Sequence, residues 1–237
     1  MQNFYVEDIN AASGYITLTG DEYMHATRSS RVRVGEKIGV TDGRGCRVVA
    51  RIESIDHQKL AAAIEQDVSG QGEPPVIISG GLALIKPARF ESAVEQCAEL
   101  GVRQMIPVIT ERCLVKPERI NIPRIQRIAR EAAKQSGRSW IPEISQPVEL
   151  HEFLQTSDNP IFVAHKDAIM SLPDVLKNVM PCYALTLIIG PEGDFTDDEI
   201  GFMKSHSVIP FSLGGLTLRS ETAIVAATAV VVAVVSK

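Results

Sequence analysis

A short stretch rich in glycine and proline divides this sequence into two parts with different hydrophobic patterns. It runs from Ser69 to Pro75 and combines flexible with stiff residues, which is typical of a linker. The chain has 237 residues, enough to bury a proper core. We therefore expect two domains, residues 1–70 and residues 74–237.

Hydrophobic and polar residues alternate in short segments of the first part, and this alternation predicts strands. The pair Asp42-Gly43, between two of these segments, is typical of a hairpin turn. Short strands at this spacing predict a small antiparallel barrel. The predicted strands are residues 15–18, 37–41, 47–55 and 60–64.

The second part alternates strands with helices, as does an α/β protein with a mostly parallel sheet covered by helices. One helix has an apolar face from Phe90 to Ala98 and ends at Gly101, a residue suited to a left-handed cap. The apolar segment Ala223–Val235 is shorter than the roughly 20 residues that cross a membrane, so we expect a buried helix there. The predicted strands are residues 76–85, 104–109, 161–164, 183–189 and 208–213.

Charge is distributed unevenly, although the formal net charge is -5. Residues 25–51 hold seven Lys/Arg and two acids, and residues 112–138 hold eight and two, so the local balances are +5 and +6. A helix predicted over residues 122–137 has its cations opposite its apolar face. Such a face is either an ordinary solvated surface or a phosphate-binding stripe, and the near absence of acids favours the stripe. The cations are Arg124, Arg127, Arg130, Lys134 and Arg138.

The cysteines argue against a metal centre. Cys46, Cys97, Cys113 and Cys182 lie far apart with no Cys-x-x-Cys pair, so neither a zinc site nor a disulfide framework is indicated. The first nine residues lack the basic and apolar segments of a secretory signal. We expect a cytoplasmic protein without a metal and without membrane association.

Two segments each combine a strand end, glycines and a helix start. The first, Ile189–Phe195, lies where open α/β sheets bind ligands, and it has no phosphate-loop sequence. Thr196 and Glu199 behind it form a capping box, which explains the nearby acids without a metal. The second, Leu213–Ala223, is either a turn with a surface ion pair or the other wall of one ligand pocket. Because both lie at strand ends of one α/β domain, we favour the pocket.

These two segments resemble the ribosomal RNA small-subunit methyltransferase E family, the N3-uridine methyltransferases of the SPOUT superfamily. The resemblance rests on Gly190-Pro191-Glu192-Gly193, Leu213-Gly214 and Leu218-Arg219-x-Glu221-Thr222-Ala223. Further blocks match along the chain, and several ordered motifs together are specific. They are His25 with Arg28 and Arg31-Val32-Arg33, Lys86 with Arg89, Glu99-Leu100-Gly101-Val102, Glu111-Arg112 and Glu131–Arg138.

The resemblance implies an N-terminal PUA-like barrel that binds RNA and a C-terminal trefoil-knot domain that binds S-adenosylmethionine. It also implies a homodimer and, as the substrate, a uridine of 16S rRNA in the assembled 30S subunit. The sequence departs from the family pattern at Asp194, where a second glycine is usual, and at Leu216-Thr217-Leu218. The Asp194 side chain is therefore expected to affect cofactor affinity.

Roles for individual residues follow from the same resemblance. We expect Arg219 to stabilise charge on a uracil carbonyl, and Glu221 either to orient Arg219 or to accept the N3 proton, with orientation favoured. The residues expected to bind the cofactor are Ile189, Gly190, Pro191, Glu192, Gly193, Leu213, Gly214, Leu216, Leu218, Thr222 and Ala223. Those expected to contact RNA are His25, Arg28, Arg31, Arg33, Lys86, Arg89, Arg112, Arg127, Lys134 and Arg138.

Two alternatives stay open. A non-enzymatic RNA-binding ribosome factor would have the barrel and the basic surfaces but would not need the glycine segments. A nicotinamide-dependent oxidoreductase is disfavoured because the sequence has no Gly-x-Gly-x-x-Gly fingerprint.

Overall fold

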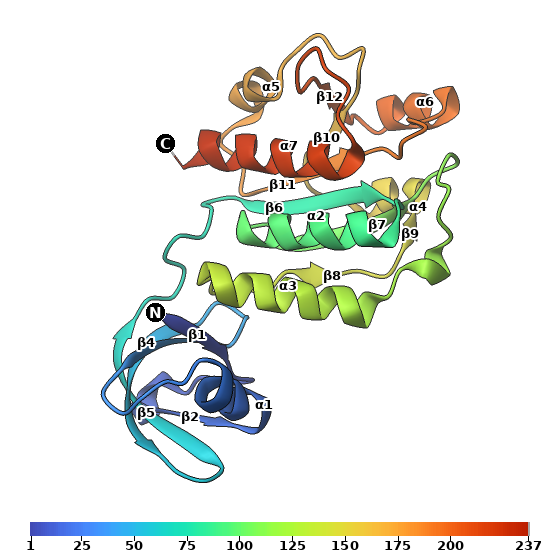
Figure 1. Cartoon of the computed structure of the whole chain (residues 1–237). Helices are drawn as coiled ribbons and strands as arrows, with labels where there is room; N and C mark the ends of the chain where they lie inside the picture. The colour runs from blue at the N-terminus through green and yellow to red at the C-terminus, as the bar shows by residue number, and fades with distance from the viewer. Residues whose placement is uncertain (237) are drawn as a thin grey trace. The chain divides into compact units, whose positions relative to one another are not determined.

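The computed structural model describes residues 1–236, and its contacts divide the chain into two compact units (Figure 1). The first unit is Met1–Glu73 together with Arg130–Ile141, and the second is Pro74–Ala129 together with Pro142–Lys237. The first unit therefore gains a segment from the middle of the chain, which the sequence pattern did not indicate.

The described part of the first unit is built around a curled five-stranded sheet with the order β1-β3-β4-β5-β2. All four predicted strands are present, and the pairs between them are antiparallel. An additional strand, β1, pairs with β3 in parallel. The strands are β1 (Gln2–Tyr5), β2 (Tyr15–Thr19), β3 (Lys37–Thr41), β4 (Arg47–Ile55) and β5 (Lys59–Asp67), and the helical turns are η1 (Ala11–Ser13), α1 (Gly20–Met24) and η2 (His25–Ser29).

The predicted hairpin turn is formed as its residues require. Gly43 adopts a φ of 68°, and the Asp42 Oδ1 accepts hydrogen bonds from the backbone N–H groups of Arg44 and Cys46. A short polar side chain before a left-handed glycine thus closes the turn between β3 and β4.

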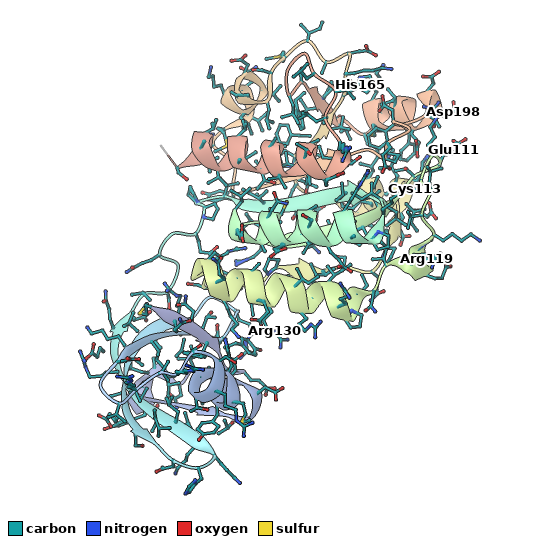
Figure 2. All side chains as sticks on the ribbon, in the orientation of Figure 1. Glu111, Cys113, Arg119, Arg130, His165 and Asp198 are labelled. Atoms are coloured by element: carbon teal, nitrogen blue, oxygen red, sulfur yellow. The ribbon has the colours of Figure 1, made fainter. Side chains whose placement is uncertain are left out.

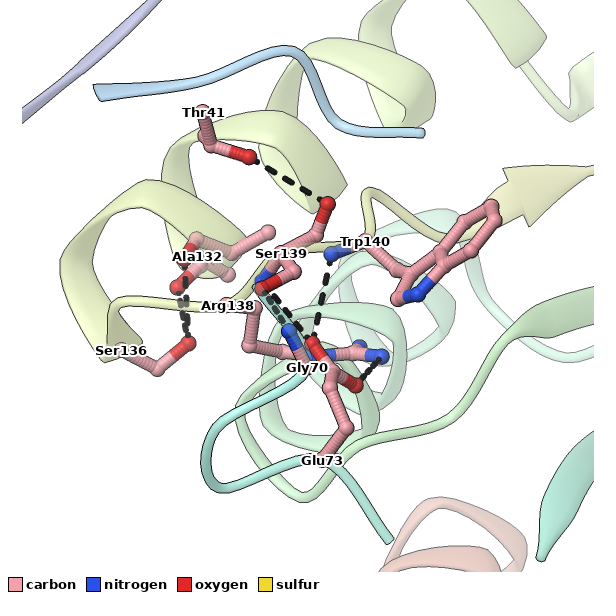
Figure 3. Close-up of polar contacts among 9 residues, drawn as sticks. Thr41, Gly70, Glu73, Ala132, Ser136, Arg138, Ser139 and Trp140 are labelled. Carbon is pink, nitrogen blue, oxygen red and sulfur yellow. Dashed lines mark hydrogen bonds and ion pairs between the residues drawn. The ribbon is translucent and has the colours of Figure 1, made fainter. Parts of the chain in front are cut away.

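Glu73 anchors the segment that follows α3 (Ile122–Ser136) to the first unit. Its carboxylate accepts hydrogen bonds from the Arg138 guanidinium and from the backbone N–H groups of Ser139 and Trp140 (Figure 3). The ion pair is buried, because the Arg138 and Glu73 side chains are only 6% and 13% exposed. A residue of the predicted linker is therefore a fixed structural element.

The described residues of the second unit form a parallel sheet with the order β12-β10-β11-β6-β7-β8, and β9 also pairs with β7. The predicted strands are confirmed, most closely β7 and β10, while short β8 and β9 were not predicted. The strands are β6 (Ile77–Ala83), β7 (Gln104–Ile109), β8 (Glu143–Ile144), β9 (Val148–Glu149), β10 (Ile161–Ala164), β11 (Ala184–Ile189) and β12 (Ile209–Phe211). The helices are α2 (Pro87–Glu99), η3 (Pro117–Arg119), α4 (Leu150–Thr156), α5 (Leu172–Val179), α6 (Asp197–Ser205) and α7 (Ser220–Val235).

Helices cover both faces of this sheet. On one face α2 and α7 lie side by side, and α7 also packs on β6 and β11 (Figure 1). There the Cys97 thiol contacts the Thr228 hydroxyl, and burial raises the pKa of this thiol to about 12, so it stays protonated. The other face packs against apolar residues of α4 and α6, including Phe153 and Met203. Helix α7 therefore ends up over the centre of the sheet, although it is the last helix.

We expect Glu73→Gln to lower the free energy of unfolding of the first unit by about 3 kcal/mol, because it removes the charge that pairs with the buried Arg138 guanidinium. Urea denaturation followed by the fluorescence of Trp140, the single tryptophan, measures this change. Asp8→Asn is the matched control, since it breaks an exposed pair with Arg44 and should change stability by less than about 0.5 kcal/mol. Equal effects of the two substitutions would contradict the anchoring role of Glu73.

Candidate active site

The structure brings the two glycine segments together at the carboxyl end of β11. The first lies in the loop between β11 and α6, and the second lies between β12 and α7. The hydroxyl of Ser220, the first residue of α7, donates a hydrogen bond of 2.7 Å to the carbonyl oxygen of Gly190. Ser220 is buried and was not singled out from the sequence, although its place inside the second segment was a signal. One direct contact therefore makes the two loops neighbours.

The loop after β11 has a conformation that only some residues permit. A side chain at Gly190 would place its Cβ 2.9 Å from the Phe195 ring. The N–H of Asp194 bonds to the carbonyl oxygen of Pro191, which closes a turn. Asp194 itself has a φ of 61°, in the region that favours glycine, and its carboxylate accepts the N–H of Phe195 at 2.9 Å. The family's usual glycine is thus replaced by an acid that caps its own turn.

An arginine from the loop after β7 supports the same turn. Arg112 Nη1 donates to the carbonyl oxygens of Gly193 at 2.9 Å and Phe195 at 3.1 Å. Glu111 and Cys113, its neighbours, mark this loop in Figure 2. The Glu111 N–H bonds to Glu199, the capping-box residue of α6. Arg112, which the sequence assigned to RNA, therefore already holds the loop through its guanidinium.

A second arginine connects both segments. Arg89, in the first turn of α2, has its Nη1 3.2 Å from Glu192 Oε1 and its Nε 3.5 Å from Glu221 Oε1. Its guanidinium is thus already paired twice, which leaves it poorly placed for the predicted RNA contact. The contact that we expected between Glu221 and Arg219 is replaced by this contact to Arg89.

The second carboxylate oxygen of Glu221 is exceptional. Glu221 Oε2 is buried and has no hydrogen-bond partner within residues 1–236, and the side chain is 16% exposed. A buried acceptor without a partner costs free energy, so such groups are rare and often functional. This oxygen lies in the first turn of α7, where the helix dipole favours negative charge.

Arg219 is positioned differently from the other arginines. It is the N-cap residue of α7 and is exposed, and its carbonyl accepts the first helical hydrogen bond from Ala223. Its guanidinium forms no hydrogen bond or ion pair with the rest of the described chain. The loop before Arg219 is exposed as well, since Leu216 is 84% exposed. Gly214 in this loop has a φ of 111°, a conformation that favours glycine. Arg219 is therefore free to bind a ligand.

The remaining residues that we assign to the cofactor differ in their burial. Ile189 is the buried end of β11, Leu218 is partly buried against the core, and Leu213 packs there as well. On α7, Thr222 is exposed whereas Ala223 is buried.

The predicted RNA contacts divide into exposed and buried residues. Lys134 is buried and bonded to Glu22 at 2.6 Å, and Arg138 is paired with Glu73, so neither charge is available to phosphate and the assignment of these two needs correction. His25 is half-exposed, lies 4.0 Å from Glu22 and packs edge-on against Phe4. The exposed cations of this set are Arg28, Arg31, Arg33, Lys86, Arg112 and Arg127, and among them Arg112 is bonded to the loop after β11.

Within residues 1–236 no group of three or more His, Cys, Asp or Glu could hold a metal ion. No helix in this range is long and apolar enough to cross a membrane.

This chain is similar to known proteins over most of its length. Residues 72–232 match the model of the RNA methyltransferase domain, and residues 18–65 match that of the RNA methyltransferase PUA domain. A ribosomal RNA small subunit methyltransferase E from Synechocystis sp. is 32% identical over 88% of this chain and 69% of its own length. A crystal structure of this enzyme from Neisseria gonorrhoeae, bound to S-adenosyl methionine, matches with a TM-score of 0.86 at 28% identity over 97% of this chain and 95% of that one.

A second solved relative is a Legionella pneumophila protein in complex with the bound cofactor SAM. It matches with a TM-score of 0.81 at 30% identity and covers 98% of this chain and 96% of that one. These matches confirm the knotted SPOUT α/β fold and the PUA domain that the sequence resemblance implied.

The left-handed conformation of Asp194 gives a testable difference between two substitutions. We expect Asp194→Gly to be more stable than Asp194→Ala by about 1 kcal/mol, because alanine resists a φ of 61° and glycine does not. Urea denaturation followed by circular dichroism measures both variants. Glu95, exposed within α2, is the control position. There the alanine variant should be more stable than the glycine variant by about 1 kcal/mol, because alanine favours a helix. The same order of stability at both positions would show that Asp194 is not left-handed in solution.

Proposed function

The chain belongs to the ribosomal RNA small subunit methyltransferase E family, and on this premise we propose that it methylates N3 of a uridine in 16S rRNA of the assembled 30S subunit. The activity is that of an S-adenosylmethionine-dependent RNA methyltransferase. This membership outweighs both the ribosome-factor and the oxidoreductase alternatives. The observation that carries the proposal is the junction of the two loops, where Ser220 bonds to Gly190 beside the unpartnered Glu221 oxygen.

The residues present fit the cofactor. A Cβ built on Gly214 or Gly215 meets no other atom within 4 Å, so their backbone is open to a ligand. The exposed Gly193 and the partly buried Gly190 line the facing loop. When bound, S-adenosylmethionine supplies an electrophilic methyl group on a sulfonium. We assign its adenosine and methionine parts to the backbone of Ile189–Gly193 and Leu213–Leu218.

The protein's own groups account for the rest of the chemistry. Uridine N3 is a weak nucleophile while it carries its proton, so the site must remove that proton and stabilise the resulting anion. Glu221 Oε2 is the acceptor that the geometry favours, because it is buried and has no other partner in the described chain. Arg219, free and always charged, donates to a uracil carbonyl that gains negative charge. The amino end of α7 adds to the same stabilisation.

We assign substrate binding to exposed cations in each unit. In the first unit Arg28, Arg31 and Arg33 are candidates, together with the half-exposed His25, and in the second Lys86 and Arg127 are. Phosphate contacts of this kind fix position without reading sequence. An rRNA substrate places the protein in the cytoplasm with the ribosome.

A homodimer is part of the proposal. Helix α7 is almost wholly apolar, yet its Val225, Val230 and Val232 are only partly buried, and a second copy would cover them. Sedimentation of the purified chain tests this part separately, since a monomeric mass would exclude the dimer.

We expect Arg219→Ala to lower the rate of methyl transfer to 30S subunits by about 10²- to 10³-fold, because it removes a preorganised donor to the developing charge. Affinity for S-adenosylmethionine should change little. The assay is transfer of labelled methyl groups to subunits from a strain that lacks this protein, followed by mapping of the modified base.

Arg44→Ala is the matched control, since Arg44 is an exposed arginine of the first unit outside the proposed contacts. It should retain full activity. Full activity of Arg219→Ala would refute its assignment, and methylation at an atom other than uridine N3 would refute the proposed product.

A further inference from the structure

A pocket of about 500 Å³ lies on the sheet of the second unit, toward the amino ends of its strands. The active site is at the carboxyl end of β11, so the two are separate. Thr186 of β11, Ser79 of β6 and Gln104 of β7 line the pocket and are direct neighbours in strand register. In a parallel sheet, residues in register point to the same face. The three side chains therefore form a polar row across neighbouring strands.

This row is unusual for its position. Strands covered on both faces are normally apolar throughout, and the same face of this sheet buries Ile106, Val163 and Ile188. Ser79 and Thr186 are 7% and 2% exposed, and neither hydroxyl hydrogen-bonds to another group in the described part of the chain. Because both residues line the pocket, their hydroxyls are open to hydrogen bonds with a ligand.

The lining determines which ligand fits. The described lining contains no lysine, arginine or histidine, so it does not match a phosphate or a free carboxylate; its one charged residue is Asp158, at the exposed rim. Gln104 Nε2 donates to Ser145 Oγ at 3.0 Å, which leaves the Gln104 carbonyl oxygen and one N–H for a ligand. Phe153 and Ile106 provide an apolar wall. The ligand is thus uncharged, carries several donors and acceptors, and has a flat apolar ring.

We propose that this pocket binds an uncharged nucleoside, taken either free from solution or as an unpaired residue of an RNA strand. The hydroxyls of Ser79 and Thr186 and the Gln104 amide would pair with the base edge, as amides and hydroxyls do in RNA recognition. The pocket volume is within the ordinary range for small ligands. This inference rests on the pocket alone and stands independently of the reaction at the active site.

The test titrates the full chain while S-adenosylhomocysteine saturates the methyltransferase site, so that adenosine cannot bind there. Guanosine, cytidine, uridine, adenosine, glucose and inorganic phosphate are compared by calorimetry and ligand-observed NMR. At least one nucleoside should bind with a Kd below about 1 mM, and glucose and phosphate should not. Thr186→Val should raise the Kd of that nucleoside at least about 10-fold, equivalent to 1.4 kcal/mol. Thr228→Val removes a buried hydroxyl on the opposite face and should have no effect on it.

Binding of a single-stranded tetranucleotide that contains this nucleoside distinguishes the two sources. If Thr186→Val also weakens binding of the tetranucleotide, the pocket binds a nucleoside within an RNA strand. If the substitution weakens binding of the free nucleoside alone, the pocket binds the free compound. Because the Thr186 hydroxyl has no protein partner and valine suits strands, this variant should keep its thermal midpoint. Ser79→Ala provides an independent second variant with the same expected loss. Binding of no nucleoside, or equal nucleoside binding by the wild type and both variants, would overturn the proposal.

Discussion

The hydrogen bond from Ser220 to Gly190 is the contact on which the active site depends. It joins the start of the last helix to the end of a central strand, two points thirty residues apart in the chain. The contact needs Ser220 to be buried, and it needs α7 to lie across β6 and β11 rather than beside the sheet. With the helix start fixed there, the exposed Arg219 and the partly buried Glu221 lie on either side of Ser220 in the chain. A loop that is open to ligand is thus held by a helix that belongs to the core.

Local features of this fold were predictable from the sequence because neighbouring residues determine them. The capping box of Thr196 and Glu199, the turn at Asp42-Gly43 and the limits of β7 all follow from short-range chemistry. Elements with little local signal were missed, among them β1, whose pairing with β3 is a contact between distant residues. The knot came only from the resemblance, since periodicity does not encode how a chain threads. The inclusion of Arg130–Ile141 in the first unit likewise depends on pairing with Glu22 and Glu73.

Charge was the weakest guide to the site, because a sequence gives the number of cations and not their partners. Four of the cations that we expected to contact RNA have different environments. Lys134 and Arg138 are buried in ion pairs, and Arg89 and Arg112 hold the loops of the active site. Arg219 differs from them because it has no partner in the described part of the chain, a property that only coordinates reveal. The glycine segments were better guides, since a strand end followed by glycine restricts both backbone and position.

The candidate active site contains a buried polar atom without a partner in the described chain. Most buried polar atoms have partners, because folding stability does not tolerate many exceptions. Glu221 Oε2 is such an exception within residues 1–236, and it lies where Arg89 and the α7 dipole both favour a negative charge. Arg89 reaches only the other oxygen, Oε1, so it can hold the carboxylate in place without occupying the oxygen that would take a proton. An acceptor that is oriented through one oxygen and left unpaired at the other suits removal of the uridine N3 proton, so we propose Glu221 as the base rather than as a group that orients Arg219.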